Sequence, residues 1–267
     1  MLRPFEGLAD EADWVAMREL VPAGTAELTL AGEHADRQVT LATVLPMAWP
    51  AMVRPDRRIL LATQLQTSSA DVSRELGDAL ARALQLDEGG AVPPRPVPAD
   101  APRLQELVDV DAPLRVVVHS GFDFWLDESD EVDADTRASL DRANEAVTPT
   151  ARLAGVDAAY WVSFGGRRQV RWVLPQPEDD VVDAFARLEA TGTLAVLPES
   201  RYLGSFRALG LAIPVWDLPD GTEVEDVEEP AVAFAARLAA ALAETTPLTA
   251  DERRARSAVR ARQLTVQ

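Results

Sequence analysis

Apolar residues recur along this chain at two spacings, one typical of helices and the other of strands. Helical spacing marks residues 14–20, 72–84, 133–145, 177–192, 230–243 and a last helix after Thr249. Runs rich in Val, Ile, Leu and Thr, which are typical of strands, cover residues 26–30, 38–45, 58–65, 114–119, 193–197 and 206–215. The pattern therefore predicts helices mixed with strands that are close enough in sequence to form hairpins.

The most specific local signal is a pair of glycines between two alternating runs. Ala159–Phe164 and Arg167–Leu174 flank Gly165 and Gly166. A two-residue hairpin turn needs positive φ angles, which glycine adopts without steric cost. We predict an antiparallel hairpin here. A phosphate-binding turn is disfavoured because a strand, and not a helix, follows the glycines.

The order of the predicted elements favours an α+β fold with largely antiparallel sheets and flanking helices. Residues 87–102 contain two glycines and five prolines, which disfavour both helix and central strand. We therefore predict an N-terminal α-β-β-β-α lobe over 1–86, a proline-rich linker over 87–102, and a C-terminal α+β lobe with terminal helices over 103–267. Residues 21–30 and 189–198 have weakly similar sequences. This similarity predicts two similar lobes from a distant duplication, with chance similarity as the alternative.

Composition excludes several classes of enzyme. The chain has no cysteine, and all 26 basic residues are arginine. A Walker phosphate loop and a Schiff-base enzyme both need lysine, whereas thiol catalysis and thiolate metal sites need cysteine. The only histidines are His34 and His119. Ser120 follows His119 in a predicted strand, so the two side chains would point to opposite faces and would not form a nucleophile–base pair. We predict no cofactor.

The net charge of −18 is concentrated in two segments. Residues 121–145 contain nine acidic residues against two arginines, and residues 217–229 contain seven acidic residues and no arginine. Residues 251–267 instead carry five arginines, which predicts either a solvated helix or a basic helix that faces an acidic body. A chain with this net negative charge would repel the phosphate backbone of a nucleic acid. A nucleic-acid-binding role is therefore disfavoured.

The densest candidate for chemistry is the acidic segment 119–128. Asp123, Asp127 and Glu128 could supply carboxylate oxygens to Mg²⁺ or Ca²⁺, with His119 as a nearby base of a metal-dependent hydrolase. The spacing lacks the glycine of a calcium-binding loop. The alternation also places Asp123, Trp125 and Asp127 on one face of a predicted strand, so the competing interpretation is a solvent-facing strand edge. Trp49 and Trp125 are the two tryptophans that we predict to face a pocket or a partner, and we expect the other four in cores.

Motifs at both ends of the chain resemble one family. They are RPFEGL at residues 3–8, DWVAMRE at 13–19, VPA at 21–23, AYWVSFGG at 159–166 and YLGSFRALGLAIPVWDL at 202–218. The chain resembles an actinobacterial family of uncharacterised proteins, a domain of unknown function of about this length. The resemblance implies lineage and a cytoplasmic setting, and it provides no catalytic residue to transfer.

Three functions are compatible with these features. No stretch approaches the roughly 18 apolar residues of a membrane span, and no apolar signal core begins the chain, so we expect a cytoplasmic protein without a membrane partner. Our first hypothesis is a non-enzymatic chaperone-like or scaffold protein that binds a protein partner or forms a homodimer. Its first two-thirds are predicted to have the α-β-β-β-α-β-β-α order of secretion-chaperone-like domains, which is a fold-level analogy. The alternatives are the metal-dependent hydrolase and an acidic nucleic-acid mimic that occupies a basic partner.

Overall fold

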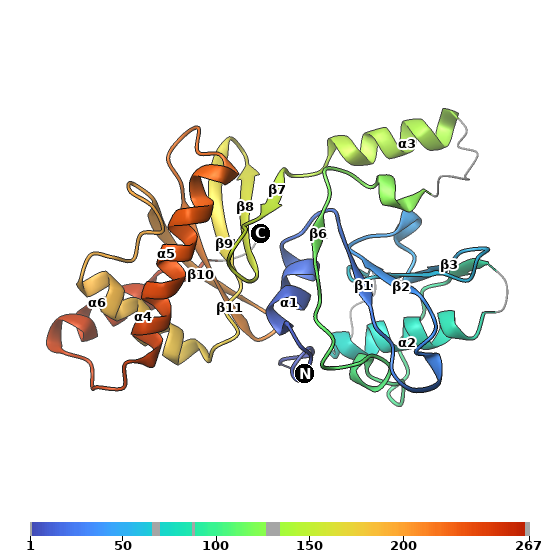
Figure 1. Ribbon diagram of the computed structural model, residues 1–267, viewed down its shortest axis with the longest axis horizontal. Coiled ribbons are helices and arrows are strands. Elements are labelled where there is room, and N and C mark those ends of the chain that lie inside the picture. The colour runs from blue at the N-terminus through green and yellow to red at the C-terminus, as the bar shows by residue number, and fades with distance from the viewer. Residues whose placement is uncertain (1, 66–69, 87–88, 127–133, 265–267) are drawn as a thin grey trace. The chain divides into compact units, whose positions relative to one another are not determined.

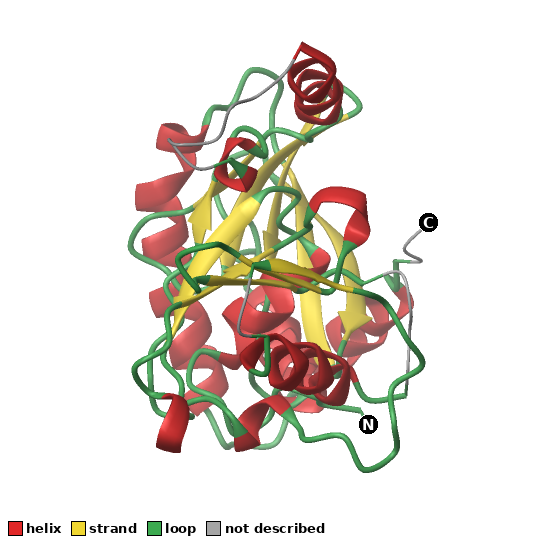
Figure 2. Cartoon of the chain, turned by 90° about the vertical axis from the view of Figure 1, so that its right-hand side faces the viewer, coloured by secondary structure: helices red, strands yellow, loops and turns green. Residues whose placement is uncertain are grey.

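The computed structural model of the 267-residue chain describes residues 2–65, 70–86, 89–126 and 134–264. The chain combines helices with two mostly antiparallel sheets, which confirms the predicted α+β class (Figure 1; Figure 2). It divides into two compact units, Met1–Val147 and Thr148–Gln267, and each unit contains one sheet. This division lies at a different place from the predicted linker at 87–102. The reason is that three residues of that segment, Gly90–Val92, pair as a strand within the first sheet.

The first unit contains a six-stranded sheet with the order β5-β3-β4-β2-β1-β6. Its strands are β1 (Gly24–Leu28), β2 (Val39–Ala42), β3 (Ala51–Val53), β4 (Ile59–Ala62), β5 (Gly90–Val92) and β6 (Val117–Val118). Neighbouring strands are antiparallel except β2 and β4, which run parallel with Val39 opposite Ile59. β3 and β5 were not predicted, because strands of three residues are too short to show a clear alternation.

A nearly buried ion pair joins the first two helices of this unit. The unit contains α1 (Glu11–Glu19), α2 (Val72–Leu84) and α3 (Ala134–Glu145). α2 begins after Asp71, whose carboxylate accepts a hydrogen bond from the Ser73 N–H at 3.2 Å, as an N-cap should. Glu75 of α2 has a fully buried side chain and lies 3.4 Å from the guanidinium of Arg18 on α1. An ion pair so little exposed to solvent is destabilised when one of its partners is removed.

The second unit contains a five-stranded antiparallel sheet with the order β10-β11-β9-β8-β7. Its strands are β7 (Thr150–Arg152), β8 (Ala159–Phe164), β9 (Arg167–Trp172), β10 (Arg201–Ala208) and β11 (Leu211–Asp217). Phe164 pairs with Arg167, and Gly165 and Gly166 have φ angles of 58° and 77°, so the predicted glycine hairpin is confirmed. The two sheets differ in strand order, and the two units are therefore not copies of one topology.

Helices cover one face of the second sheet. They are α4 (Glu178–Ala190), α5 (Val224–Ala243) and α6 (Ala250–Ala261). α4 and α5 lie against the sheet (Figure 1), where Phe185 and Phe234 from the helices pack with Trp161 and Trp216 from the strands. Trp216 also donates its indole N–H to the Leu194 carbonyl at 2.9 Å. Among the helices described, none has the length and apolar character needed to cross a membrane.

Three predicted strands were wrong. Residues 193–197 form no strand, since Leu194 and Val196 reach the core from a loop. Residues 206–215 contain a turn at Leu209 and Gly210, with φ angles of 48° and 86°, and so belong to two strands. Residues 121–126, which include Asp123 and Trp125 of the predicted acidic strand, contain a 3-10 helix instead of an alternating strand. The α-β-β-β-α-β-β-α order, predicted for the first two-thirds of the chain, runs instead from α3 to α5.

Gly77 provides a test of the packing around α2. A Cβ atom at this position would lie 2.1 Å from the carbonyl oxygen of Pro102. Alanine normally stabilises a helix interior by roughly 1 kcal/mol relative to glycine. We predict that Gly77→Ala instead lowers the free energy of unfolding by about 1–3 kcal/mol, measured by urea denaturation. Gly90→Ala is the control, because a Cβ there meets no atom within 4 Å. A Gly77→Ala variant at least as stable as the wild type would contradict this packing.

Candidate functional site

The predicted acidic site is only partly within the described residues. Asp123 begins the 3-10 helix η4 (Asp123–Trp125), where the Phe122 N–H donates to the Asn144 side chain at 2.7 Å. This turn replaces the strand predicted to carry Asp123 and Trp125. The exposed Asp123 carboxylate accepts a hydrogen bond from the Asn144 amide at 3.2 Å and lies 3.8 Å from the Arg137 guanidinium. Its contacts therefore lie on α3.

The metal-binding hypothesis remains a prediction. Asp127 and Glu128 lie outside the residues that the structure describes. Within the described ranges, no three His, Asp or Glu side chains come close enough together to hold a metal ion. The hypothesis therefore depends on carboxylates that have no described position.

An aromatic cluster surrounds Trp125. Its indole N–H donates to the Val44 carbonyl at 2.8 Å, and its ring stacks on Phe122 at a centroid distance of 4.6 Å. Trp49 is half-buried and follows the 3-10 helix η2 (Pro46–Ala48), in which Met47 has a φ of 54° and an exposed fraction of 83%. The surface near η2 thus has one exposed apolar side chain. Partner binding by Trp49 and Trp125 remains a prediction.

His119 lies beside this cluster. Its Nε2 atom is 2.8 Å from the Thr25 hydroxyl, and its ring centroid is 5.1 Å from that of Phe124. Burial lowers the pKa of His119 below its ordinary value of 6.5. The ring is therefore neutral at neutral pH. Its hydrogen bond with Thr25 and its packing against Phe124 indicate a structural role.

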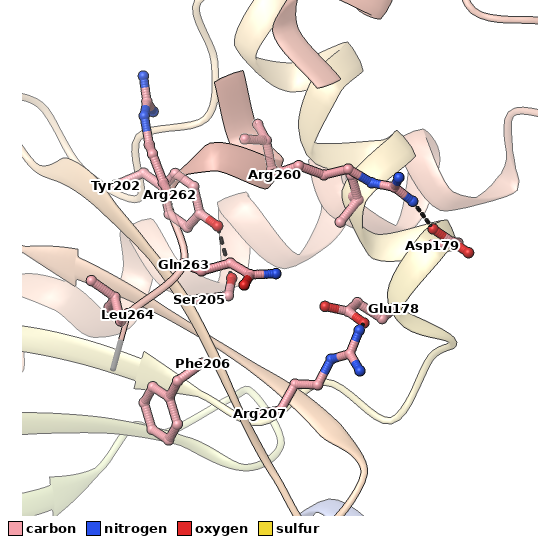
Figure 3. Close-up of a pocket in the computed structure, with 12 residues that line it drawn as sticks. Glu178, Asp179, Tyr202, Ser205, Phe206, Arg207, Arg260, Arg262, Gln263 and Leu264 are labelled. Atoms are coloured by element: carbon pink, nitrogen blue, oxygen red, sulfur yellow. Dashed lines mark hydrogen bonds and ion pairs between the residues drawn. The ribbon is translucent and has the colours of Figure 1, made fainter. Parts of the chain in front are cut away.

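A cavity of about 570 Å³ opens in the second unit (Figure 3). None of the residues that we singled out as a metal or partner site lines it. The start of α4, strand β10, the end of α6 and the segment after α6 contribute its walls: Glu178, Asp179, Val182, Tyr202, Ser205, Phe206, Arg207, Val259, Arg260, Arg262, Gln263 and Leu264.

The polar groups of this cavity are largely paired with one another. Glu178 forms an ion pair with Arg207, and Asp179 forms one with Arg260. The Tyr202 hydroxyl lies 2.7 Å from the Ser205 hydroxyl (Figure 3). Burial raises the pKa of Tyr202 above 10.0, although the hydrogen bond with Ser205 and the charge of Arg262 act in the opposite direction. At neutral pH the tyrosine keeps its proton, so the cavity is lined by two neutral hydroxyls as well as by the paired charges.

The chain itself forms an isolated β-bridge to β10 beside this cavity. β10 is an edge strand of the sheet. The Ser205 N–H donates to the Arg262 carbonyl at 3.0 Å, and the Leu264 N–H donates to the Ser205 carbonyl at 2.9 Å. These two bonds form a parallel bridge between Ser205 and Gln263. Because bridged residues direct their side chains to the same face, Ser205 and Gln263 both line the cavity.

Gly204 makes this close approach possible. Its φ angle is 144°, and a Cβ atom there would lie 2.1 Å from the Arg262 carbonyl oxygen. The pairing of β10 with β11 is irregular between Tyr202 and Gly204. A bulge of this kind changes which side chains share a face, so that Tyr202 and Ser205 meet although they are three residues apart.

The sequence pattern did not predict this site, because the predicted strand over 206–215 begins after Tyr202, Gly204 and Ser205. The available signal was Gly204 within the YLGSFR motif. An isolated glycine in a strand often marks a bulge or the close approach of another backbone. The partner of that glycine lies 58 positions along the chain, at Arg262, and no local pattern identifies it.

Substitution of Gly204 tests the bridge between Ser205 and Gln263. We predict that Gly204→Ala displaces Arg262–Leu264, because the new methyl group would overlap the Arg262 carbonyl. The Ser205 and Leu264 amides should then exchange hydrogen faster, as measured by NMR or mass spectrometry. Gly221→Ala is the control, since Gly221 also has a positive φ, of 79°, but a Cβ atom there would meet no atom within 4 Å. Unchanged exchange at Ser205 in Gly204→Ala would contradict the bridge.

His119 gives a prediction about pH. Because folding lowers its pKa, the unfolded chain takes up the proton more readily, and the free energy of unfolding falls as the pH drops below about 6.5. The loss is complete once the pH is below the lowered pKa of the folded state. We predict that His119→Gln removes this contribution, measured by urea denaturation at several pH values between about 5 and 7.5. His34→Gln is the control, and an equal change in both variants would contradict the assignment.

Comparisons with known proteins place the chain in a family. No curated protein and no solved structure matches it. Residues 4–267 match a family described as a family of unknown function (DUF5926). That match covers nearly the whole chain, including the strand β10, the cavity and the segment after α6. The chain therefore belongs to this family of unknown function, DUF5926.

Proposed function

We propose that this protein binds an extended segment of a partner protein, which joins the second sheet as a strand beside β10. The observation that carries the proposal is the bridge between Ser205 and Gln263, in which an extended piece of chain already occupies this edge. Edge strands present unpaired N–H and C=O groups to which another strand can add. In such recognition, main-chain hydrogen bonds provide affinity and neighbouring pockets select side chains.

The cavity beside the bridge supplies the pocket. Arg262, Gln263 and Leu264 line this cavity and would leave when the partner enters, so the walls that remain for the pocket come mainly from α4 and β10. A partner residue at the position of Gln263 would direct its side chain towards the hydroxyls of Tyr202 and Ser205. Since these hydroxyls are neutral at neutral pH, they can both donate and accept hydrogen bonds.

A chaperone-like or scaffold role agrees with this geometry. The element order from α3 to α5 is that of secretion-chaperone-like domains, but α3 belongs to the first compact unit, so the second unit alone matches only its last seven elements. The proposal includes a cytoplasmic setting, which the resemblance to an actinobacterial family implies. The metal-dependent hydrolase and the nucleic-acid mimic stay alternative predictions, and no contact within the described ranges favours either.

A reversible disulfide that holds the segment after α6 on β10 tests the proposed function. The chain has no cysteine, so Ser205→Cys/Gln263→Cys would introduce a single disulfide across the bridge. Peptides that bind the reduced variant are first selected from a random displayed library. We predict that oxidation of the variant weakens their binding at least tenfold, and that dithiothreitol restores it. Fluorescence anisotropy with each selected peptide measures the change.

A second cysteine pair serves as the control. Ser163 and Arg168 are paired across the β8–β9 hairpin, and Ser163→Cys/Arg168→Cys would place a disulfide away from β10 in the same sheet. Oxidation of this control should leave peptide binding unchanged. Selected peptides that bind equally to the oxidised and reduced Ser205→Cys/Gln263→Cys variant would contradict strand addition at β10.

A further inference from the structure

The segment that pairs with β10 is the end of a longer element. We call residues Thr249–Leu264 the arm. It consists of α6, capped by the Thr249 side chain, and the segment that pairs with Ser205. Within the arm, which the structure describes completely, Val259 is the one buried residue. The arm therefore buries little apolar surface, and other interactions must hold it in place.

Charge holds the arm against α4. Arg256 contacts Asp183 and lies 3.4 Å from Asp179, and Arg260 pairs with the same Asp179 carboxylate. Arg262 lies 3.0 Å from Glu189. These contacts confirm the interpretation that the arginine-bearing helix faces acidic residues, in preference to a fully solvated helix. A further pair, in which Arg187 of α4 lies 3.5 Å from Glu252 of the arm, is less exposed. The arginine pairs of the arm are more exposed, and such pairs contribute little each and weaken as salt increases.

Release of the arm would open a continuous groove. A second cavity, of about 610 Å³, is also lined by Arg262, together with Glu189, Leu194 and Arg201 among others. Tyr202 and Arg262 line both cavities, and the Arg262 guanidinium carbon lies 5.9 Å from the Tyr202 ring centroid. Without Arg262, the two cavities would join along β10.

We infer that the arm is an internal mimic of the partner, and that the surface beneath it recognises a basic segment of another protein. This inference rests on the proposed function. Once the arm leaves, Asp179, Asp183 and Glu189 lose their guanidinium partners, and Ser205 loses its main-chain partner. A competing segment must therefore supply arginine or lysine side chains at a spacing like that of the arm, and then an extended stretch that pairs with β10.

The arm sequence itself is the probe for this inference. A fluorescent synthetic peptide of residues Thr249–Leu264 is titrated with the full-length chain at low and high salt, and anisotropy reports binding. Arg256→Gln/Arg260→Gln weakens the chain's own arm, so we expect the peptide to bind this variant at least tenfold more tightly than the wild type, and more weakly at high salt. Arg254→Gln is the matched control, because Arg254 pairs with Asp251 inside α6, and it should behave as the wild type.

Two altered peptides separate this inference from the proposed function. Replacing the arginines at 256, 260 and 262 by glutamate tests recognition of charge, and N-methylation of Leu264 removes the N–H that pairs with Ser205. Binding that is lost with either peptide supports both ideas. Binding that survives the charge reversal but not the N-methylation overturns the inference alone. Binding that survives N-methylation but not the charge reversal contradicts strand addition, and supports only the part of the inference that concerns recognition of a basic segment.

Hydrogen exchange shows whether the arm was released. The α6 amides of Arg256→Gln/Arg260→Gln should exchange faster than those of the wild type, while the β8–β9 hairpin stays protected. Unchanged exchange in α6 overturns the inference, because charge would then not hold the arm. Failure of the peptide to bind a variant with a released arm also overturns it. A dimer in light scattering that forms by exchange of arms would assign the surface to a second copy of the chain and overturn the basic partner.

Discussion

The edge of β10 is the constraint on which the arrangement of the second unit depends. A strand at the edge of a sheet has N–H and C=O groups without partners, and proteins cover or block such edges to avoid uncontrolled pairing. Here the segment after α6 covers Ser205 with two main-chain hydrogen bonds. Gly204 must lack a side chain for this segment to approach. The cavity, the bulge and the ion pairs of the arm are all arranged around this one contact.

The use of arginine alone as the cation suits this arrangement. A guanidinium is planar and has several N–H donors, so it can contact two carboxylates at once, whereas an ammonium group is a single point of charge. Arg256 does this with Asp179 and Asp183, which are four residues apart on one face of α4. The acidic residues of α4 and the arginines of the arm are therefore matched in charge, although they lie outside the two acidic segments that carry most of the net charge of −18.

Local signals predicted those parts of the fold that depend on neighbours in sequence. The hairpin at Gly165 and Gly166 was predicted because its turn needs positive φ angles that only a few residues adopt readily. Helices α2 and α6 were predicted because periodicity and capping act within one or two turns. The failures have a shared cause. Residues 193–197 and 121–126 have apolar positions like those of a strand, but they fill the core or an aromatic cluster from a loop and a 3-10 turn.

The sequence by itself determined the α+β class, the glycine hairpin, the charged character of the last helix and the absence of lysine and cysteine chemistry. These properties follow from composition and from interactions over a few residues. Only the tertiary structure decided that Gly204 meets Arg262, that Tyr202 meets Ser205 across a bulge, and that the arginines of α6 meet the carboxylates of α4. Contacts between positions so far apart in sequence depend on how sheets and helices pack, and the physical reason they escape prediction is that no local pattern of residues specifies which distant backbone an edge strand will accept.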